Sequence, residues 1–129
     1  MEKVYTKKAP EAVGPYSQAI VSGNYVFTSG QLGIGENGKL GDGIISQTEN
    51  ALRNLSEVLL AAGTDLKNVV KTTCFLANIK DFSSFNEIYG KYFTEKPARS
   101  LIEASALPKG ALVEIEAIAE IKKAYGDKI

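Results

Sequence analysis

Histidine and tryptophan are absent from the 129-residue sequence, and cysteine and methionine occur once each. Without histidine, the chain cannot form a Ser-His-Asp or Cys-His catalytic centre, and zinc sites built from cysteine and histidine are excluded. The lone cysteine, Cys74, cannot close a disulfide bond within the chain, which favours a reducing cytoplasm. Any chemistry must therefore use arginine, carboxylates, hydroxyl groups and the backbone.

An excess of charge of either sign is also lacking, because 15 basic residues balance 15 acidic ones. A neutral chain offers no electrostatic attraction for nucleic acid or an anionic membrane. No apolar run is long enough to span a bilayer, and the first residues contain no apolar signal segment. No Asp-rich loop suggests a calcium or magnesium site. We therefore expect no metal, no membrane association and no nucleic acid as main partner.

The length of 129 residues, with 44% apolar and 23% charged residues, is typical of one globular domain. We expect a single domain over residues 1–129, in which residues 122–129 form a polar tail. Neither an internal repeat nor a linker is visible in the sequence.

Stretches rich in β-branched and aromatic residues predict β-strands. They are two strands between Tyr16 and Gln31 around a turn at Ser22-Gly23-Asn24, then Val69–Leu76, Arg99–Ser105 and Leu112–Ile121. The strand at 69–76 is apolar on both faces, which is typical of an interior position. The last two strands are joined through Pro108-Lys109-Gly110, and we expect them to form one hairpin.

Helical spacing of apolar residues predicts two helices. The first runs through Ala51–Ala62 and ends at Gly63, with Ser46-x-x-Glu49 spaced as a capping box, although its start could lie a few residues earlier. The second carries the aromatic stripe Phe82–Tyr92 and must end before Pro97. These elements predict an α+β fold, a mixed sheet of about five or six strands with two helices on one face.

The last strand has two different faces. One is apolar and suits the helices: Val113, Ile115, Ala117, Ala119 and Ile121. The other is mixed: Leu112, Glu114, Glu116, Ile118 and Glu120. Because two helices can cover only one face, the economical interpretation is that a second subunit covers the other, with a site at the interface. A plainly solvated face is the alternative.

Arg99 is a candidate ligand-binding residue. It follows Pro97-Ala98 and therefore begins its strand in an extended conformation. Its planar guanidinium fits a carboxylate through two parallel hydrogen bonds. The alternative is a structural ion pair with Glu116 or Glu114.

Glu114 is the second candidate. The expected hairpin places it roughly opposite or diagonal to Leu101 and Glu103. Glu114 and Glu116 point to the same face, and two like charges on a covered face are costly unless something pairs with them. A functional and a structural role both remain open.

Three further residues lie beside predicted turns. Tyr16 follows the rigid Gly14-Pro15 turn, and its alternative role is core packing. Ser29 and Gly30 end a strand, where the glycine permits close approach of another group. A nucleophilic role for Ser29 is disfavoured because no histidine can serve as its base.

The segment Gly33-Ile34-Gly35-Glu36-Asn37-Gly38 matches the spacing of a dinucleotide-binding loop. That loop requires a helix that opens within the motif. Here the Asn37-Gly38 dipeptide favours a tight hairpin turn instead. Nucleotide binding is therefore disfavoured.

Several motifs occur in a particular order along the chain. They are Gly14-Pro15-Tyr16-Ser17-Gln18-Ala19, Ser29-Gly30-Gln31, Val69-Val70-Lys71-Thr72-Thr73, Asn86-Glu87-Ile88-Tyr89, Pro97-Ala98-Arg99-Ser100, Leu107-Pro108-Lys109-Gly110 and Glu114-Ile115-Glu116-Ala117-Ile118-Ala119. In this order they resemble the reactive intermediate deaminase (RidA/YjgF) family over about residues 9 to 121. The resemblance is specific for the family and less specific for the substrate.

The resemblance implies a chorismate-mutase-like fold, a homotrimer with clefts between subunits, and a cofactor-free enamine/imine deaminase. Its substrates would be 2-iminobutanoate and 2-iminopropanoate, released by pyridoxal-phosphate enzymes. Arg99 would bind the carboxylate and Glu114 would orient the attacking water. The residues expected to line or support the cleft are Tyr16, Ser29, Gly30 and Asn86. Leu101 stands where many members have cysteine, a position that acts through its backbone.

Two other functions remain as alternatives. One is a non-catalytic trimer that senses a carboxylate metabolite through the same arginine. The other is RNA cleavage or translation inhibition, against which the neutral charge and the absence of histidine argue.

Overall fold

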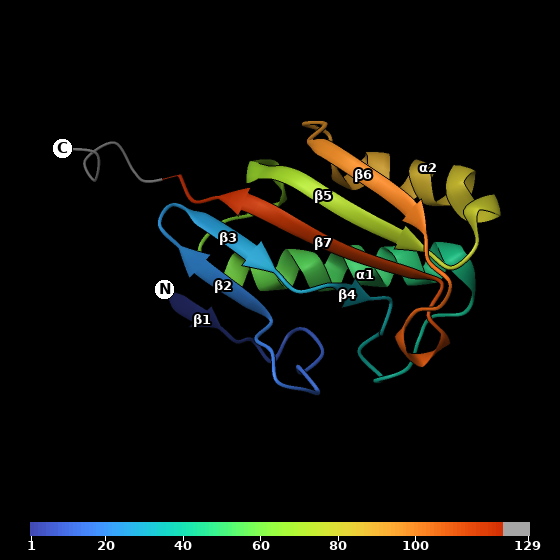
Figure 1. Cartoon of the computed structure of the whole chain (residues 1–129), viewed down its shortest axis with the longest axis horizontal. Coiled ribbons are helices and arrows are strands. Elements are labelled where there is room, and N and C mark those ends of the chain that lie inside the picture. Colours follow the sequence, from blue (N-terminus) through green and yellow to red (C-terminus); the bar gives the residue numbers. More distant parts are fainter. Residues whose placement is uncertain (123–129) are drawn as a thin grey trace.

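The computed structural model describes residues 1–122, so nearly all of the predicted polar tail lies outside the described residues. The chain forms a seven-stranded mixed sheet with two helices on one face (Figure 1). The strands are β1 (Glu2–Val4), β2 (Ala19–Ser22), β3 (Tyr25–Thr28), β4 (Gln31–Leu32), β5 (Val69–Leu76), β6 (Ala98–Glu103) and β7 (Val113–Glu120). The helices are α1 (Gly43–Ala61) and α2 (Phe82–Tyr92), with short 3₁₀ turns at Leu66–Asn68, Ile79–Asp81 and Pro108–Gly110.

The predicted α+β class and the two helices on one face are confirmed. The sheet has more strands than the five or six expected, because β1 and β4 are too short to leave a pattern in the sequence. Three residues of β1 pair with β2, and two residues of β4 pair with β7. The order across the sheet is β1-β2-β3-β7-β5-β6.

The predicted hairpin between the last two strands is wrong. Strand β5 lies between β6 and β7, parallel to the first and antiparallel to the second. Helix α2 carries the chain from β5 across the sheet, so that β6 joins the outer side of β5 in parallel. The loop after β6 then returns the chain to the inner side of β5, which places the long apolar strand β5 in the interior.

Helix α1 begins three residues before the predicted capping box. Its N-cap is Asp42, which makes no side-chain capping hydrogen bond, and Gly43 adopts a positive φ of 84°. The predicted end is confirmed at Gly63, whose φ is 92°, and the N–H of Thr64 donates to the carbonyl of Leu59. Ser46 therefore lies inside the first turn and does not cap the helix.

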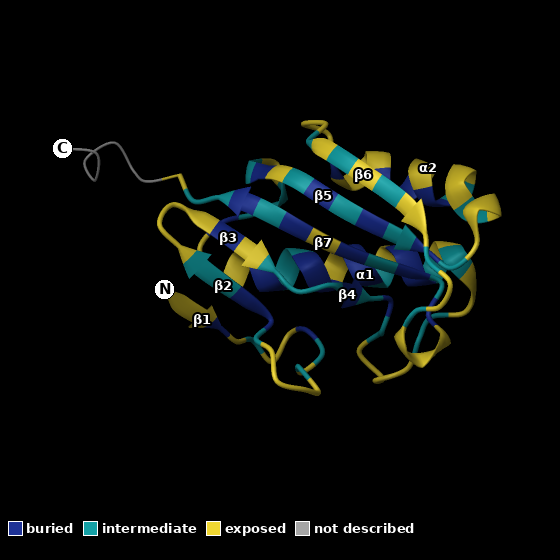
Figure 2. Ribbon diagram, in the orientation of Figure 1, coloured by how far each residue is buried: buried dark blue, intermediate teal, exposed yellow. Residues whose placement is uncertain are grey.

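The core fills the space between the helices and one face of the sheet. In β7, Val113, Ile115, Ala117 and Ala119 are buried, whereas Glu116 is exposed. Figure 2 shows the same alternation as bands of colour along β5 and β7. Within residues 1–122, no helix covers the other face, where Phe27 is 44% and Ile102 is 53% exposed. We call this uncovered surface the open face.

Buried amide side chains fasten the loops to this framework. Gln18 accepts a hydrogen bond from the N–H of Thr6 and donates to the carbonyls of Thr6 and Pro10. Asn54 on α1 donates to two carbonyls of the loop around β4, and Gln47 accepts from the N–H of Leu112. Because each amide satisfies buried backbone groups, it fixes the path of a segment that has no regular structure of its own.

Two glycines allow a matched test of this packing. A Cβ on Gly33 would collide with the backbone of Gln47, whereas a Cβ on Gly90 in α2 would meet nothing within 4 Å. We expect Gly33→Ala to destabilise the fold by about 1–3 kcal/mol through overpacking. Gly90→Ala should stabilise it by up to about 1 kcal/mol through helix propensity. Urea unfolding measures both, and shifts in the same direction would contradict the packing of α1 against β4.

Candidate functional site

Arg99 lies near the start of the edge strand β6, on the face covered by the helices. One of its Nη1–H groups donates to Oδ1 of Asn86 on α2 at 2.7 Å. The guanidinium carbon lies 4.7 Å from the ring centre of Tyr89 and 5.8 Å from that of Phe82. The alternative, an ion pair with Glu114 or Glu116, is not formed within residues 1–122. The arginine is instead held by an amide and two aromatic rings, which leaves its positive charge available to a ligand.

Glu114 lies on the open face, near the start of β7. Its side chain approaches Gly30 so closely that a Cβ there would overlap the carboxylate. Burial raises the pKa of Glu114, and the neighbouring charge of Glu116 raises it further. Gly30 is thus required for this position of the carboxylate, and the raised pKa brings proton exchange at Glu114 closer to neutral pH.

Ser29 and Tyr16 flank the same region of the chain. The hydroxyl of Ser29 donates to the carbonyl of Ser17 at 2.5 Å, and its N–H donates to the carbonyl of Gln18 at 2.9 Å. Ser29 therefore supports the segment beside Gly30. Tyr16 is 51% exposed, so its alternative role in the core is wrong.

The structure does not bring Arg99 and Glu114 together within one chain. Arg99 is the register partner of Thr72, and Glu114 is the partner of Phe75 on the same strand β5. Ideal strand spacing separates their Cα atoms by roughly 14 Å. Thr72 is buried under the helices, whereas Glu114 belongs to the open face, so the two side chains point to opposite faces of the sheet. Leu101 lies on the helix-covered side with Arg99 and is partly buried against the core.

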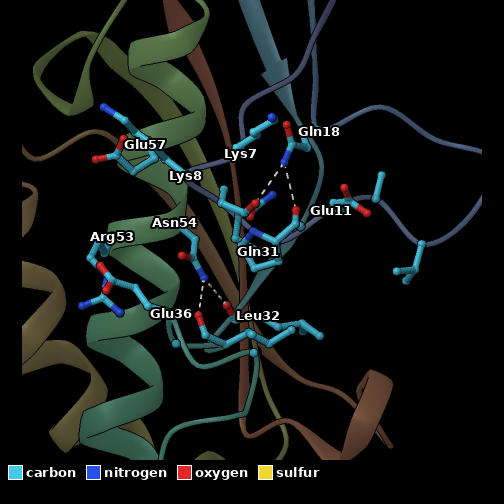
Figure 3. A pocket seen from close by; sticks show the side chains of 18 of the residues that line it. Lys7, Lys8, Glu11, Gln18, Gln31, Leu32, Glu36, Arg53, Asn54 and Glu57 are labelled. Atoms are coloured by element: carbon cyan, nitrogen blue, oxygen red, sulfur yellow. Dashed lines mark hydrogen bonds between the residues drawn. The ribbon is translucent and has the colours of Figure 1, made fainter.

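One cavity lies apart from Arg99 and Glu114. It has a volume of ≈ 790 Å³ and is bounded by residues 7–13, the loop after β4 and helix α1. Its charged lining includes both signs, as Figure 3 shows for Lys7, Lys8, Glu11, Glu36, Arg53 and Glu57. Of the predicted site residues it touches Tyr16 and Gly30, whereas Arg99 and Glu114 do not line it.

The structure also bears on whether a reactive thiol or a metal site exists within residues 1–122. Cys74 is fully buried, and burial raises its pKa to about 11, which keeps the thiol protonated and unreactive. Among residues 1–122, no group of three or more histidine, cysteine, aspartate or glutamate side chains could hold a metal ion. No helix in that range is both long and apolar enough to cross a membrane.

Sequence reasoning missed two residues that lie beside Arg99. Tyr89 was assigned only to the apolar stripe of α2, yet its ring lies under Arg99. Thr72 was assigned only to a strand, yet its hydroxyl and that of Tyr89 are 2.7 Å apart. The signal that was available is the polar atom each residue carries at an otherwise apolar, buried position.

Comparison with known proteins defines the class to which this fold and site belong. The family model described as Endoribonuclease L-PSP matches residues 6–121. Reactive Intermediate Deaminase A, chloroplastic, of Arabidopsis thaliana is 52% identical over 123 residues, which cover 93% of this chain and 66% of that protein. The 2-iminobutanoate/2-iminopropanoate deaminase of Homo sapiens is 48% identical over 119 residues, or 90% of this chain and 87% of that protein.

A solved structure agrees with these relatives. RidA from an Antarctic Psychrobacter species superposes with a TM-score of 0.91 at 42% identity, covering 94% of this chain and 100% of that one. The chain belongs to the Endoribonuclease L-PSP family, also called the RidA/YjgF family. The family assignment made from the ordered sequence motifs is therefore confirmed.

The raised pKa of Glu114 predicts a particular dependence of stability on pH. Because the folded state holds this proton more tightly than the unfolded state, the resulting stability is present below the unfolded pKa and is lost as the pH rises through the folded pKa. At pH 7.5, Glu114→Gln should therefore resist urea better than the parent. Near about pH 3.5, where the carboxyl is protonated in both states, the difference should disappear.

The control for this measurement is Glu49→Gln, a change of the same kind at an exposed position of α1. It should show no such difference between the two pH values. A loss of stability for Glu114→Gln at pH 7.5 would contradict the prediction, because it would mean that a cation stabilises the charged carboxylate.

Proposed function

We propose that the protein is a cofactor-free deaminase that hydrolyses 2-imino acids and their enamine tautomers to 2-oxo acids and ammonia. The observation that carries the proposal is the pair of residues with complementary roles. Arg99 is an unpaired guanidinium held on Tyr89 by Asn86, and Glu114 is a carboxyl group with a raised pKa beside Gly30. Relatives named as 2-iminobutanoate/2-iminopropanoate deaminases, at 48–49% identity, support the same activity and substrates.

The reaction assigns one task to each group. Arg99 binds the carboxylate of the substrate through two parallel hydrogen bonds. Glu114 takes a proton from a water molecule as the water oxygen bonds to the imine carbon. Glu114 passes this proton to the imine nitrogen, which gives the carbinolamine. Glu114 then transfers the hydroxyl proton of the carbinolamine to its amine, the carbon–nitrogen bond breaks, and ammonia leaves as the carbonyl forms. Positioned acid–base catalysis contributes about 10²–10⁴-fold, which suffices for imines that already hydrolyse in water.

The position of the site follows from the two faces of the sheet. Arg99 and Glu114 of one chain cannot reach the same small molecule, because the sheet separates them. We therefore place each site between two subunits, with Arg99 supplied by one chain and Glu114 by the next. The exposed apolar side chains of the open face, including Phe27 and Ile102, are what a second subunit would cover. A closed ring of three such contacts is the homotrimer implied by the family resemblance.

Tyr16, Ser29 and Gly30 would then line or support the Glu114 side of the cleft, and Asn86 the Arg99 side. The backbone near Leu101 lies on the outer strand β6, beyond which no strand is paired within residues 1–122. Its N–H and C=O groups are therefore suited to orient the imine. A reducing cytoplasm remains the expected compartment.

A non-catalytic sensor would use Arg99 but would not need Glu114. The two functions are separated by an assay in which purified threonine dehydratase generates the imine and release of 2-oxobutanoate is timed. Arg99→Ala should reduce the acceleration by about 2–5 kcal/mol, or roughly 30- to 5,000-fold, because it removes the charged partner of the carboxylate. Arg99→Lys should restore only part, since an ammonium cannot make the two-pronged contact.

Glu114→Gln should reduce the same rate while still binding 2-oxobutanoate. Arg53→Ala removes the chain's other arginine, which is exposed on α1, and should leave the rate unchanged. A parent protein that binds 2-oxobutanoate without accelerating imine hydrolysis would favour the sensor. Full activity in a folded Arg99→Ala variant would exclude both functions of the arginine.

Mixing two inactive variants tests the location of the site. If each site takes Arg99 from one chain and Glu114 from the next, co-refolded Arg99→Ala and Glu114→Gln chains form some interfaces in which both residues are intact. Equal, random mixing should restore about a quarter of the parent activity, since half of the chains supply each residue. Light scattering should give three times the 13.9 kDa chain mass. An active monomer, or inactive mixed trimers, would place the site elsewhere.

A further inference from the structure

A buried hydrogen bond lies directly beside Arg99 and connects α2 to the sheet. Thr72 of β5 is the register partner of Arg99 on β6, and both side chains face α2. The hydroxyl oxygens of Thr72 and Tyr89 are 2.7 Å apart, and the two residues are 0% and 7% exposed. This hydrogen bond holds the phenol of Tyr89 against β5, beside Arg99. The ring of Tyr89 therefore lies against the guanidinium of Arg99.

Neighbouring aromatic rings hold Tyr89 in this orientation. The ring centre of Tyr89 is 5.5 Å from that of Phe85 and 4.5 Å from that of Phe93, both fully or almost fully buried. Phe85 lies one turn before Tyr89 on α2, and Phe93 is the C-cap residue just after the helix. The ring is thus fixed by its hydroxyl at one end and by core packing along its sides, and it is a rigid surface for the guanidinium.

Asn86 uses one hydrogen-bond donor of Arg99 and leaves the others available. A guanidinium has five N–H donors in one plane. One Nη1–H is used by Asn86, and the ring of Tyr89 lies against the group at 4.7 Å. The Nε and Nη2 donors form the other edge of the guanidinium, which has no hydrogen-bond partner within residues 1–122. Such an edge can make two parallel hydrogen bonds to a planar carboxylate.

We propose that Tyr89, anchored by Thr72, is a positioning residue that orients Arg99 so that this free edge receives the carboxylate of a small 2-oxo or 2-imino acid. The proposal rests on the function given above for Arg99. It adds that the rotation of the guanidinium is decided by a buried phenol–hydroxyl bond in the core, which touches no substrate. Burial raises the pKa of Tyr89, so the phenol stays protonated and the bond persists over the neutral pH range.

Two variants break the same bond from opposite ends. Tyr89→Phe keeps the ring, and Thr72→Val keeps the shape of the strand side chain. Each should weaken binding of 2-oxobutanoate by a similar factor, roughly two- to tenfold, and the double variant should be no worse than either one. Tyr89→Leu also removes the ring and should weaken binding by roughly tenfold or more. Tyr92→Phe is the matched control, because Tyr92 lies on the same helix and is partly exposed.

A spectroscopic measurement reports on the arginine itself. The chain has only two arginines, Arg53 and Arg99, so a ¹⁵N NMR spectrum contains two Nε–H signals, which Arg53→Lys assigns. In the parent, the Arg99 signal should be the one that shifts with 2-oxobutanoate and exchanges slowly with water. In Tyr89→Phe and Thr72→Val its exchange should accelerate, whereas the Arg53 signal should not change.

The last comparison separates positioning from a merely structural role. In an Arg99→Lys background, Tyr89→Phe should still lower the melting temperature but should no longer weaken binding. A loss of binding that persists in that background would overturn the proposal. So would unchanged affinity and unchanged Arg99 exchange in folded Tyr89→Phe and Thr72→Val variants.

These readouts do not depend on turnover. If imine hydrolysis is not accelerated but the binding and exchange effects occur, the positioning role stands and the proposed catalysis fails. If hydrolysis is accelerated but 2-oxobutanoate leaves the Arg99 signal unchanged, the catalysis stands and the positioning proposal fails.

Discussion

The alternation of side chains across strands β5, β6 and β7 is the constraint on which the rest of this structure depends. Because both helices cover one face, every second residue of these strands is committed to the core and the others to the open face. Arg99 belongs to the first set and Glu114 to the second. A shift of one residue in the register of β6 or β7 would move Arg99 or Glu114 to the opposite face of the sheet.

This constraint explains why the two sides of the site differ in character. The arginine side is built into the core, since Arg99 rests on Tyr89, which is hydrogen-bonded to the fully buried Thr72. The glutamate side is built from loop backbone, since Glu114 fits only because residue 30 lacks a side chain. One half thus owes its geometry to aromatic packing, and the other to close approach of the chain and to a carboxyl group whose burial raises its pKa.

Much of the framework was predictable from local patterns. The end of α1 at Gly63, the tight turn at Asn37-Gly38 and the buried face of β7 all follow from glycine conformation or from residue spacing. The start of α1 was left open over a few residues, because Asp42 and Gly43 begin the helix without a side-chain cap that the sequence could reveal. The short strands β1 and β4 were missed, because two or three residues carry no periodicity and form strands only through their partners.

The sequence by itself determined the chemistry that is available: arginine and carboxylates without histidine, an α+β pattern, and membership of the RidA/YjgF family. It also singled out Arg99 and Glu114 as the residues to consider. Only the tertiary structure decided that β5 separates them, that they point to opposite faces, and that Tyr89 lies under the arginine. The physical reason is that residue type and spacing act locally. Strand order and the contacts of a side chain depend instead on which distant segments pack together. Here helix α2 connects β5 to β6, and the chain then returns so that β7 pairs with the other side of β5.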